Sequence, residues 1–381
     1  MRFLIAALFA LGFQFTSAQS NWNFSHITTD DGLSTGTVNC VFKDSKGFIW
    51  IGTIDGLNRY DGYEITVYKK DKNDPKSISG NIISAISEDA NGNIWIGTRN
   101  NGISVFEWES DSFLAFEDLS KIELPEGRIR ALERTFNDQM LIGIEGGGLL
   151  LYDVLNATAQ QYRANSGQAG ELSDNTILSL ARASEKTYWV TSLATQVDLF
   201  NVETGRFEHV SYDPSYEPNE NTRKVVMEGS NGILWLGTDG KGLVKIDRKT
   251  NEQVLYDVST SNLKSNIITT LYEGRNGSIY VGTDGKGINV FDPVSETFTF
   301  VASSLLDPNS LSSDAVYQIY EDDSGVIWVS TFRGGVNTYS PQRTKFELYK
   351  QVPYENNSLS FASVIDVFET RDGKIWIGTD G

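Results

Sequence analysis

Residues that could carry chemistry are few in this chain of 381 residues, and their types exclude several reactions. There is one cysteine, Cys40, and there are two histidines, His26 and His209. A disulfide within the chain is therefore excluded, as are zinc sites built from four cysteines or from two cysteines and two histidines. Mechanisms that need several histidines are excluded as well, and we expect no catalytic residue, metal or cofactor in this chain.

A second set of candidates consists of polar and charged side chains in short glycine-rich loops. Arginines, lysines and carboxylates mixed with aromatic rings such as Phe332 would suit a sugar, through hydrogen bonds and ring stacking. For each of them, an ordinary solvated loop charge is the alternative explanation. The candidate ligand contacts are Asp55, Arg99, Asn100, Glu145, Asp239, Lys241, Asp284, Lys286 and Arg333.

Three patterns resemble known motifs but lack the context that these motifs need. The glycine clusters at 237–242 and 282–287 open a strand, so the helix of a phosphate-binding loop is missing. The alternating acidic and amide residues at 89–93 lack the glycine position and the bidentate glutamate of an EF-hand. The segment 24–27 contains His26 but lacks the acidic residue of a kinase phospho-acceptor box, and we interpret it as an ordinary strand.

The candidate loops belong to a sequence unit that occurs eight times. The segment Gly-Phe-Ile-Trp-Ile-Gly-Thr at 47–53 returns as Gly-Asn-Ile-Trp-Ile-Gly-Thr at 92–98, and then six more times with changes. Successive copies are 45 to 48 residues apart, and six of the eight tryptophans occupy the same position of the unit. The anchor residues at this position are Trp50, Trp95, Leu141, Trp189, Trp235, Tyr280, Trp328 and Trp376.

Each unit has the pattern of four short β-strands. Runs of β-branched and aromatic residues alternate with turns rich in Asp, Asn and Gly. A sheet of this size cannot bury both faces alone, whereas sheets stacked radially cover one another. The sequence therefore predicts an all-β fold, a β-propeller, in which each buried anchor tryptophan contributes roughly 4–6 kcal/mol before the entropy cost.

The number of blades follows from how the ring closes. The stretch Trp22–Ile27 resembles a lone outermost strand, and the simplest interpretation is that it completes the blade that begins at Ala315. This predicts a seven-bladed propeller over 21–341, followed at 344–381 by the first strands of a second, truncated propeller. The chain would then be a fragment of a longer protein. An eight-bladed ring with a frayed last blade is the alternative.

The N-terminus and the charge indicate where the protein works. Residues 1–18 have the short positive start, apolar run and small-residue end of a signal peptide, which predicts export to a periplasm. No later stretch is apolar and long enough to span a membrane. The net charge of −18 argues against nucleic-acid binding through this region.

The repeat strongly resembles the two-component regulator propeller repeat. The resemblance rests on an entry motif Leu-Ser-x-Asn, on acidic residues such as Glu88 and Asp89, and on Trp95-Ile-Gly-Thr98 followed by Gly102. The third and fourth copies depart from the motif at Leu141 and at 191–192, so we expect irregular blades there.

The resemblance implies the periplasmic sensor region of a Bacteroidetes-type hybrid sensor histidine kinase. It implies an oligosaccharide ligand, a homodimer in the full-length form, and attachment to the inner membrane only through segments beyond Gly381. Two other functions stay open. One is an exported carbohydrate-active propeller enzyme of sialidase or lyase type, and the other is a protein-interaction scaffold.

Overall fold

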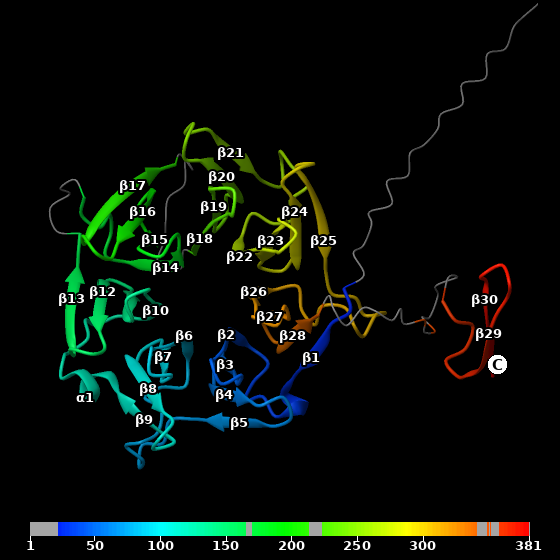
Figure 1. Ribbon diagram of the computed structural model, residues 1–381, viewed down its shortest axis with the longest axis horizontal. Coiled ribbons are helices and arrows are strands. Elements are labelled where there is room, and N and C mark those ends of the chain that lie inside the picture. Colours follow the sequence, from blue (N-terminus) through cyan, green and yellow to red (C-terminus); the bar gives the residue numbers. More distant parts are fainter. Residues whose placement is uncertain are drawn as a thin grey trace, which may run out of the picture.

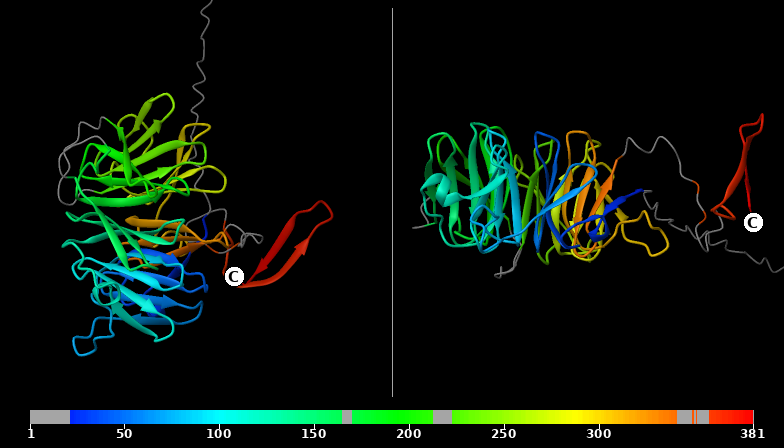
Figure 2. Two further views of the ribbon diagram at one scale, coloured as in Figure 1. Left: turned by 60° about the vertical axis from the view of Figure 1, so that its left-hand side comes forward. Right: turned by 90° about the horizontal axis from the view of Figure 1, so that it is seen from below.

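The computed structural model describes residues 22–164, 170–212, 223–340, 349, 351 and 358–380. The predicted signal peptide lies outside these residues. Seven four-stranded antiparallel sheets surround a central axis, as Figure 1 shows. Seen from the side, these sheets form a flat disc (Figure 2). The prediction of an all-β, seven-bladed propeller is confirmed.

The four strands of a blade are termed a to d from the axis to the rim. Blades 1 and 2 contain β2 (Val38–Lys43), β3 (Ile49–Thr53), β4 (Gly56–Tyr60), β5 (Ile65–Tyr68), β6 (Ile83–Glu88), β7 (Ile94–Thr98), β8 (Ile103–Glu107) and β9 (Ser112–Ala115). Blades 3 and 4 contain β10 (Ile129–Arg134), β11 (Gln139–Ile144), β12 (Gly148–Asp153), β13 (Thr158–Tyr162), β14 (Ile177–Arg182), β15 (Thr187–Ser192), β16 (Gln196–Asn201) and β17 (Arg206–Ser211). Blades 5 and 6 contain β18 (Lys224–Glu228), β19 (Ile233–Thr238), β20 (Leu243–Asp247), β21 (Gln253–Tyr256), β22 (Ile268–Glu273), β23 (Ile279–Thr283), β24 (Ile288–Asp292) and β25 (Thr297–Val301).

Blade 7 joins the two ends of the ring. It contains β26 (Val316–Glu321), β27 (Ile327–Thr331), β28 (Val336–Tyr339) and, as its strand d, β1 (Ser25–Ile27). Strand β1 runs antiparallel to β28, with Ser25 opposite Thr338 and Ile27 opposite Val336. The predicted closing segment therefore does close the ring, although its strand begins at Ser25 rather than at Trp22. The described residues also contain two short helices, η1 (Thr29–Asp31) after β1 and α1 (Phe116–Ser120) after β9.

The anchor side chains lie between the blades, as the repeat predicts. Trp50, Trp95, Leu141 and Trp189 are fully buried, and Trp235, Tyr280 and Trp328 are at most 8% exposed. Two of them pack against a ring in strand c of the next blade: the ring of Trp50 lies 5.2 Å from that of Phe106, and the ring of Trp95 lies 5.6 Å from that of Tyr152. Blades 3 and 4 are regular four-stranded sheets. The expectation of irregularity there was wrong, because Leu141 and Trp189 fill the same inter-blade space as the other anchors.

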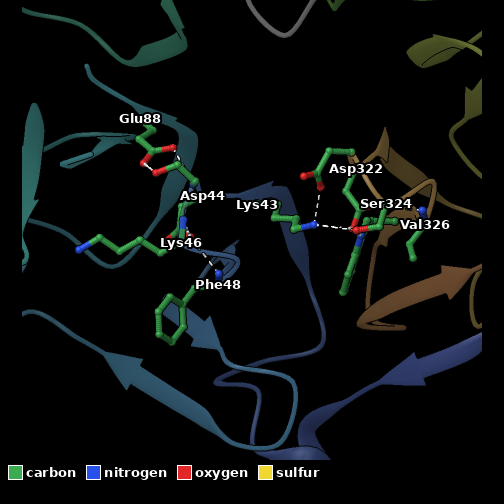
Figure 3. Close-up of polar contacts among 11 residues, drawn as sticks. Lys43, Asp44, Lys46, Phe48, Glu88, Asp322, Ser324 and Val326 are labelled. Atoms are coloured by element: carbon green, nitrogen blue, oxygen red, sulfur yellow. Dashed lines mark hydrogen bonds and ion pairs between the residues drawn. The ribbon is translucent and has the colours of Figure 1, made fainter. Parts of the chain in front are cut away.

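The turns between strands a and b tie neighbouring blades together. Figure 3 shows these turns in blades 1 and 7. Lys43, at the end of strand a in blade 1, donates to Ser324 of blade 7 at 2.9 Å and forms an ion pair with Asp322 at 3.6 Å. On its other side, blade 1 donates from the backbone of Ser45 to Glu88 of blade 2 at 2.8 Å.

A hairpin of β29 (Val364–Glu369) and β30 (Ile375–Thr379) follows the ring. It repeats the register of strands a and b, since Phe368 faces Trp376 as Phe42 faces Trp50. Within the described residues the hairpin forms its own two-stranded sheet, and Trp376 is 65% exposed. Strand β2 packs directly beside β26, so no blade separates the first from the seventh and the eight-bladed alternative is excluded.

Candidate functional site

The innermost strand of every blade lines a channel along the propeller axis. These strands are β2, β6, β10, β14, β18, β22 and β26, and Figure 1 shows them facing the centre. Successive side chains of a strand alternate between its two faces. Every second residue of a strand a can therefore face the channel, and loops after strands b and before strands a surround one of its ends.

A cavity of about 290 Å³ occupies this end of the channel, and we call it the channel mouth. Its volume is at the small end of ordinary small-molecule pockets. All seven blades contribute to it. Its lining residues are Asn39, Ile54, Ile82, Ser84, Arg99, Arg128, Arg130, Leu178, Arg223, Lys224, Val225, Thr269 and Tyr317.

The channel mouth is strongly cationic. Four arginines and Lys224 line it, and no aspartate or glutamate does. The chain as a whole has 50 acidic and 32 basic residues. The positive charge of the mouth is therefore opposite in sign to the net charge of the chain. A local concentration of positive charge is typical of sites that attract anions.

Arg128 is the most constrained of these arginines. Its Nε is buried and has no hydrogen-bond partner among the described residues. Glu145 Oε2 lies 3.6 Å from this atom but accepts from Arg130 Nε at 2.6 Å. Burial lowers the pKa of Arg128 and the charges of Arg130, Arg99 and Arg223 lower it further, whereas Glu145 opposes this change. One carboxylate thus serves two guanidinium groups.

Lys224, the first residue of β18 in blade 5, also lines the mouth. It is 1% exposed, and its Nζ donates to the carbonyl oxygens of Ser192, at 2.8 Å, and Ala194. Burial lowers the pKa of Lys224 to about 8, and the charges of Asp174 and Asp198 oppose this change. Its ammonium group is committed to backbone oxygens, so its main role is to hold the loop after β15.

Two aromatic rings of blade 7 adjoin the cationic cluster. The ring of Tyr317 lies 6.1 Å from that of Phe332. The guanidinium carbon of Arg223 lies 4.8 Å from the centre of the Tyr317 ring, and that of Arg333 lies 4.8 Å from the centre of the Phe332 ring. Phe332 is 36% exposed. Exposed rings beside hydrogen-bonding groups are what a sugar face requires.

The channel widens below the mouth into a cavity of about 820 Å³. The two cavities share lining residues, among them Asn39, Arg130 and Tyr317. The deeper part has mixed charge, because Glu88, Glu133 and Arg182 line it as well. Burial raises the pKa of Glu133 to about 7, an effect that the charge of Arg182 opposes.

The structure brings together three of the nine ligand contacts predicted from the sequence. Arg99, Asn100 and Glu145 line a shallow cavity of about 500 Å³, which adjoins the mouth through Arg99 and Arg128.

The other six predicted residues line neither the mouth nor this neighbouring cavity. Asp55 forms an ion pair with Lys69 at 2.6 Å. Asp284 and Lys286 are exposed, whereas Asp239 and Lys241 are partly buried. Arg333 lies over Phe332.

Sequence reasoning missed Arg128, Arg130, Arg223 and Lys224. Arg128 lies just before β10 and Arg130 is its second residue, and both approach Glu145, whose Oε2 lies 3.6 Å from Arg128 Nε and 2.6 Å from Arg130 Nε. Two arginines two positions apart at the entry to a strand a were a usable indication in the sequence. The approach of Arg223 to Arg128, which lies 95 positions earlier in the chain, depends on the curvature of the ring and was not visible in the sequence.

Both histidines of the chain are among the described residues. The described residues contain no group of three or more His, Cys, Asp or Glu side chains arranged to hold a metal ion. His26 lies in β1 and contacts the carbonyl oxygen of Ser310, and His209 lies in the rim strand β17. In that same part of the chain, no helix has the length and apolar character needed to cross a bilayer.

The structure is that of a seven-bladed β-propeller with a cationic cavity at one end of its channel. Five segments of this chain match the family described as two component regulator propeller, at residues 32–55, 77–100, 262–285, 310–333 and 358–381. The chain therefore carries the repeats of the two-component regulator propeller family.

Similar proteins agree with this assignment. The chain is 38% identical over 69 residues to a protein named histidine kinase P4 of Formosa agariphila, a match that covers 18% of this chain and 5% of that protein. The extracellular domain of a hybrid two-component system of B. thetaiotaomicron has the same fold, with a TM-score of 0.74 and 23% identity. This match covers 94% of the chain and 47% of that domain, so the chain spans about half the length of that structure.

A propeller enzyme also shares the fold. A streptogramin B lyase matches with a TM-score of 0.59 and 14% identity, over 84% of this chain and 98% of the lyase. At this identity the likeness concerns the fold alone.

Proposed function

We propose that this chain is the ligand-sensing propeller region of a two-component regulator and that it has no catalytic activity of its own. The observation that carries the proposal is the set of five matched repeats on a fold shared with the extracellular domain of a hybrid two-component system. In this proposal residues 1–18 direct the protein to the periplasm and residues 344–381 begin a second propeller. Segments beyond Gly381 would supply the membrane anchor, the dimer contacts and the kinase.

The proposed ligand is an oligosaccharide, and the proposed site is the channel mouth with the loops around it. Tyr317 and Phe332 offer ring faces, while Arg99, Asn100 and Arg128 offer hydrogen-bond donors. Such a combination of stacking surface and directed polar groups is how proteins hold sugars against the competition of water.

Thermal melting with a panel of oligosaccharides tests this proposal. A ligand that binds the folded state raises Tm by mass action. Each ligand that raises Tm is then incubated with the protein and the products are analysed. Saturable binding without turnover supports the sensor. Turnover would show instead a carbohydrate-active enzyme, and the absence of any ligand together with capture of a defined periplasmic protein would show a scaffold.

A further inference from the structure

We propose that the channel mouth binds an anionic ligand, one that presents carboxylate, sulfate or phosphate groups to Arg99, Arg128, Arg130 and Arg223. This proposal rests on the proposed function in one respect, namely that the sensed oligosaccharide would be an acidic one. The site itself follows from the charges and contacts of the mouth.

The first argument is the charge of the mouth. Five cationic side chains from blades 2, 3 and 5 line a cavity of about 290 Å³ that has no carboxylate in its lining. Like charges brought this close repel one another, and partial burial strengthens the repulsion because less water screens it. The neighbouring Glu145 offsets only part of the charge. An anion bound in the mouth would reduce this repulsion.

The second argument is the unused hydrogen-bonding capacity of Arg128. Its buried Nε donates to no described residue, although burying such a donor unpaired costs about 1–3 kcal/mol. Glu145 already accepts from Arg130 Nε at 2.6 Å. A guanidinium group offers parallel donors that fit two oxygens of one carboxylate, sulfate or phosphate group. The Arg128 side chain is 24% exposed, so the part of its guanidinium group beyond the buried Nε is what we expect to contact the anion.

The third argument is the position of Tyr317 within the same cavity. Its ring lines the mouth, and Arg223 lies over it at 4.8 Å. A sugar ring placed against Tyr317 would bring its substituents toward Arg223 and Arg128. These two arginines are near each other, since the charge of Arg223 lowers the pKa of Arg128. An acidic sugar would use both features at once, whereas a neutral sugar would leave the arginines unneutralised.

The test uses isothermal titration calorimetry on the full chain with four probes. The probes are inorganic sulfate, citrate, a trimer of galacturonic acid and the neutral galactose trimer of the same length. We expect citrate or the acidic trimer to bind more tightly than the neutral trimer, and we expect the affinity to fall with added salt because exposed charge interactions are screened. Failure of sulfate, citrate and the acidic trimer to bind at millimolar concentration would overturn the proposal.

Arg128→Gln and Arg223→Gln are the diagnostic variants, and Arg206→Gln on the exposed rim strand β17 is the control with the same change in charge. Each mouth variant should lose about tenfold or more in affinity for the anionic probe, while the control keeps its affinity. Without ligand, Arg128→Gln should melt at the same temperature as the parent or higher, since one repelling charge is gone. Unchanged affinity in both mouth variants would contradict the proposal, as would equal losses in the control.

The outcomes separate this inference from the proposed function. A neutral oligosaccharide that binds independently of Arg128 would leave a sensor without an anion site. Anion binding that depends on Arg128, with no oligosaccharide in the panel bound, would keep the site and remove the support for oligosaccharide sensing.

Discussion

The indole Nε1 of Trp50 donates to Asp44 Oδ2 at 2.7 Å, deep between blades 1 and 2. Asp44 is 4% exposed, and its other oxygen accepts from the backbone of Lys46 and of Phe48. The same bond joins Trp95 to Asp89 at 2.9 Å, and it recurs in blade 7. The aspartate that opens the turn thus both shapes the turn and pairs with the indole group that the anchor tryptophan buries.

Replacing this aspartate tests how much the pairing contributes. In Asp44→Ala the indole N–H and two backbone N–H groups lose a charged acceptor, so we expect the free energy of unfolding to fall by about 2–3 kcal/mol. Urea denaturation measures the change. Asp323→Ala, in the turn of blade 7, is the control, because Asp323 is 84% exposed and its ion pair with Lys43 should contribute less than about 1 kcal/mol. Equal losses in the two variants would contradict the assigned role.

Blade 5 lacks this pairing, and the missing acceptor can be supplied. Gly229 stands where the turns of blades 1, 2 and 7 have Asp44, Asp89 and Asp322, and Trp235 Nε1 is buried without a hydrogen-bond partner in the described chain. A Cβ on Gly229 would lie 3.5 Å from Trp235 Nε1 and 3.0 Å from Asn231 Oδ1. Asn231 is exposed and can rotate away, since the new carboxylate would also take over the backbone N–H of Ile233. We expect Gly229→Asp to raise the free energy of unfolding by about 1 kcal/mol, measured by urea denaturation.

The equivalent substitution in blade 6 is the matched control for Gly229→Asp. A Cβ on Gly274 would lie 2.4 Å from Cε2 of Tyr280, so the Tyr280 ring fills the space that a carboxylate at this position would need. Gly274→Asp should therefore destabilise the protein. Stabilisation by Gly274→Asp, or destabilisation by Gly229→Asp, would contradict the interpretation that the unpaired indole N–H of Trp235 lowers the free energy of unfolding.

Gly335 controls the closure of the ring. It has a φ of +74°, and a Cβ there would lie 2.2 Å from the carbonyl oxygen of Ile27 in the closing strand β1. Gly62 has a φ of +102° with nothing within 4 Å of its Cβ position. Both alanine variants meet backbone strain, but only Gly335→Ala displaces β1, so its loss of unfolding free energy should be larger by about 2 kcal/mol. Thermal and urea denaturation of both variants would check this, and equal losses would contradict it.

The sequence was sufficient to predict the propeller because each of its seven units places a large anchor side chain at the same position, where it packs between two blades. Trp50 and its equivalents mark the inter-blade space, and a strand before the first complete unit can pair only with the last one. The channel mouth was less predictable. Arg99 was identified from its loop, but Arg223 comes near Arg128 only through the curvature of the ring, which sums small rotations between blades. Contacts across an axis are not encoded in the spacing of any single unit.

Lys224 makes stability depend on pH. Its pKa is about 8 in the folded protein, against an ordinary value of 10.5. Below pH 8 the folded and unfolded chains both carry its proton, whereas between about pH 8 and 10.5 the unfolded chain binds the proton more strongly. The free energy of unfolding therefore gains a contribution that rises with pH in this window, by up to about 1.4 kcal/mol per pH unit. Above pH 9 Cys40 opposes the rise, because burial raises the pKa of Cys40 to about 12 and the folded chain then keeps the thiol proton.

Comparison of the parent with Lys224→Met isolates the lysine, because Cys40 is present in both proteins. We expect the stability difference in favour of the parent to grow from pH 8 to pH 9 in urea denaturation. The variant should also be less stable at both pH values, since the carbonyl groups of Ser192 and Ala194 lose their donor. A difference that stays constant with pH would mean that Lys224 keeps its proton in the folded protein, and that its ammonium group contributes a full positive charge to the channel mouth at every pH tested.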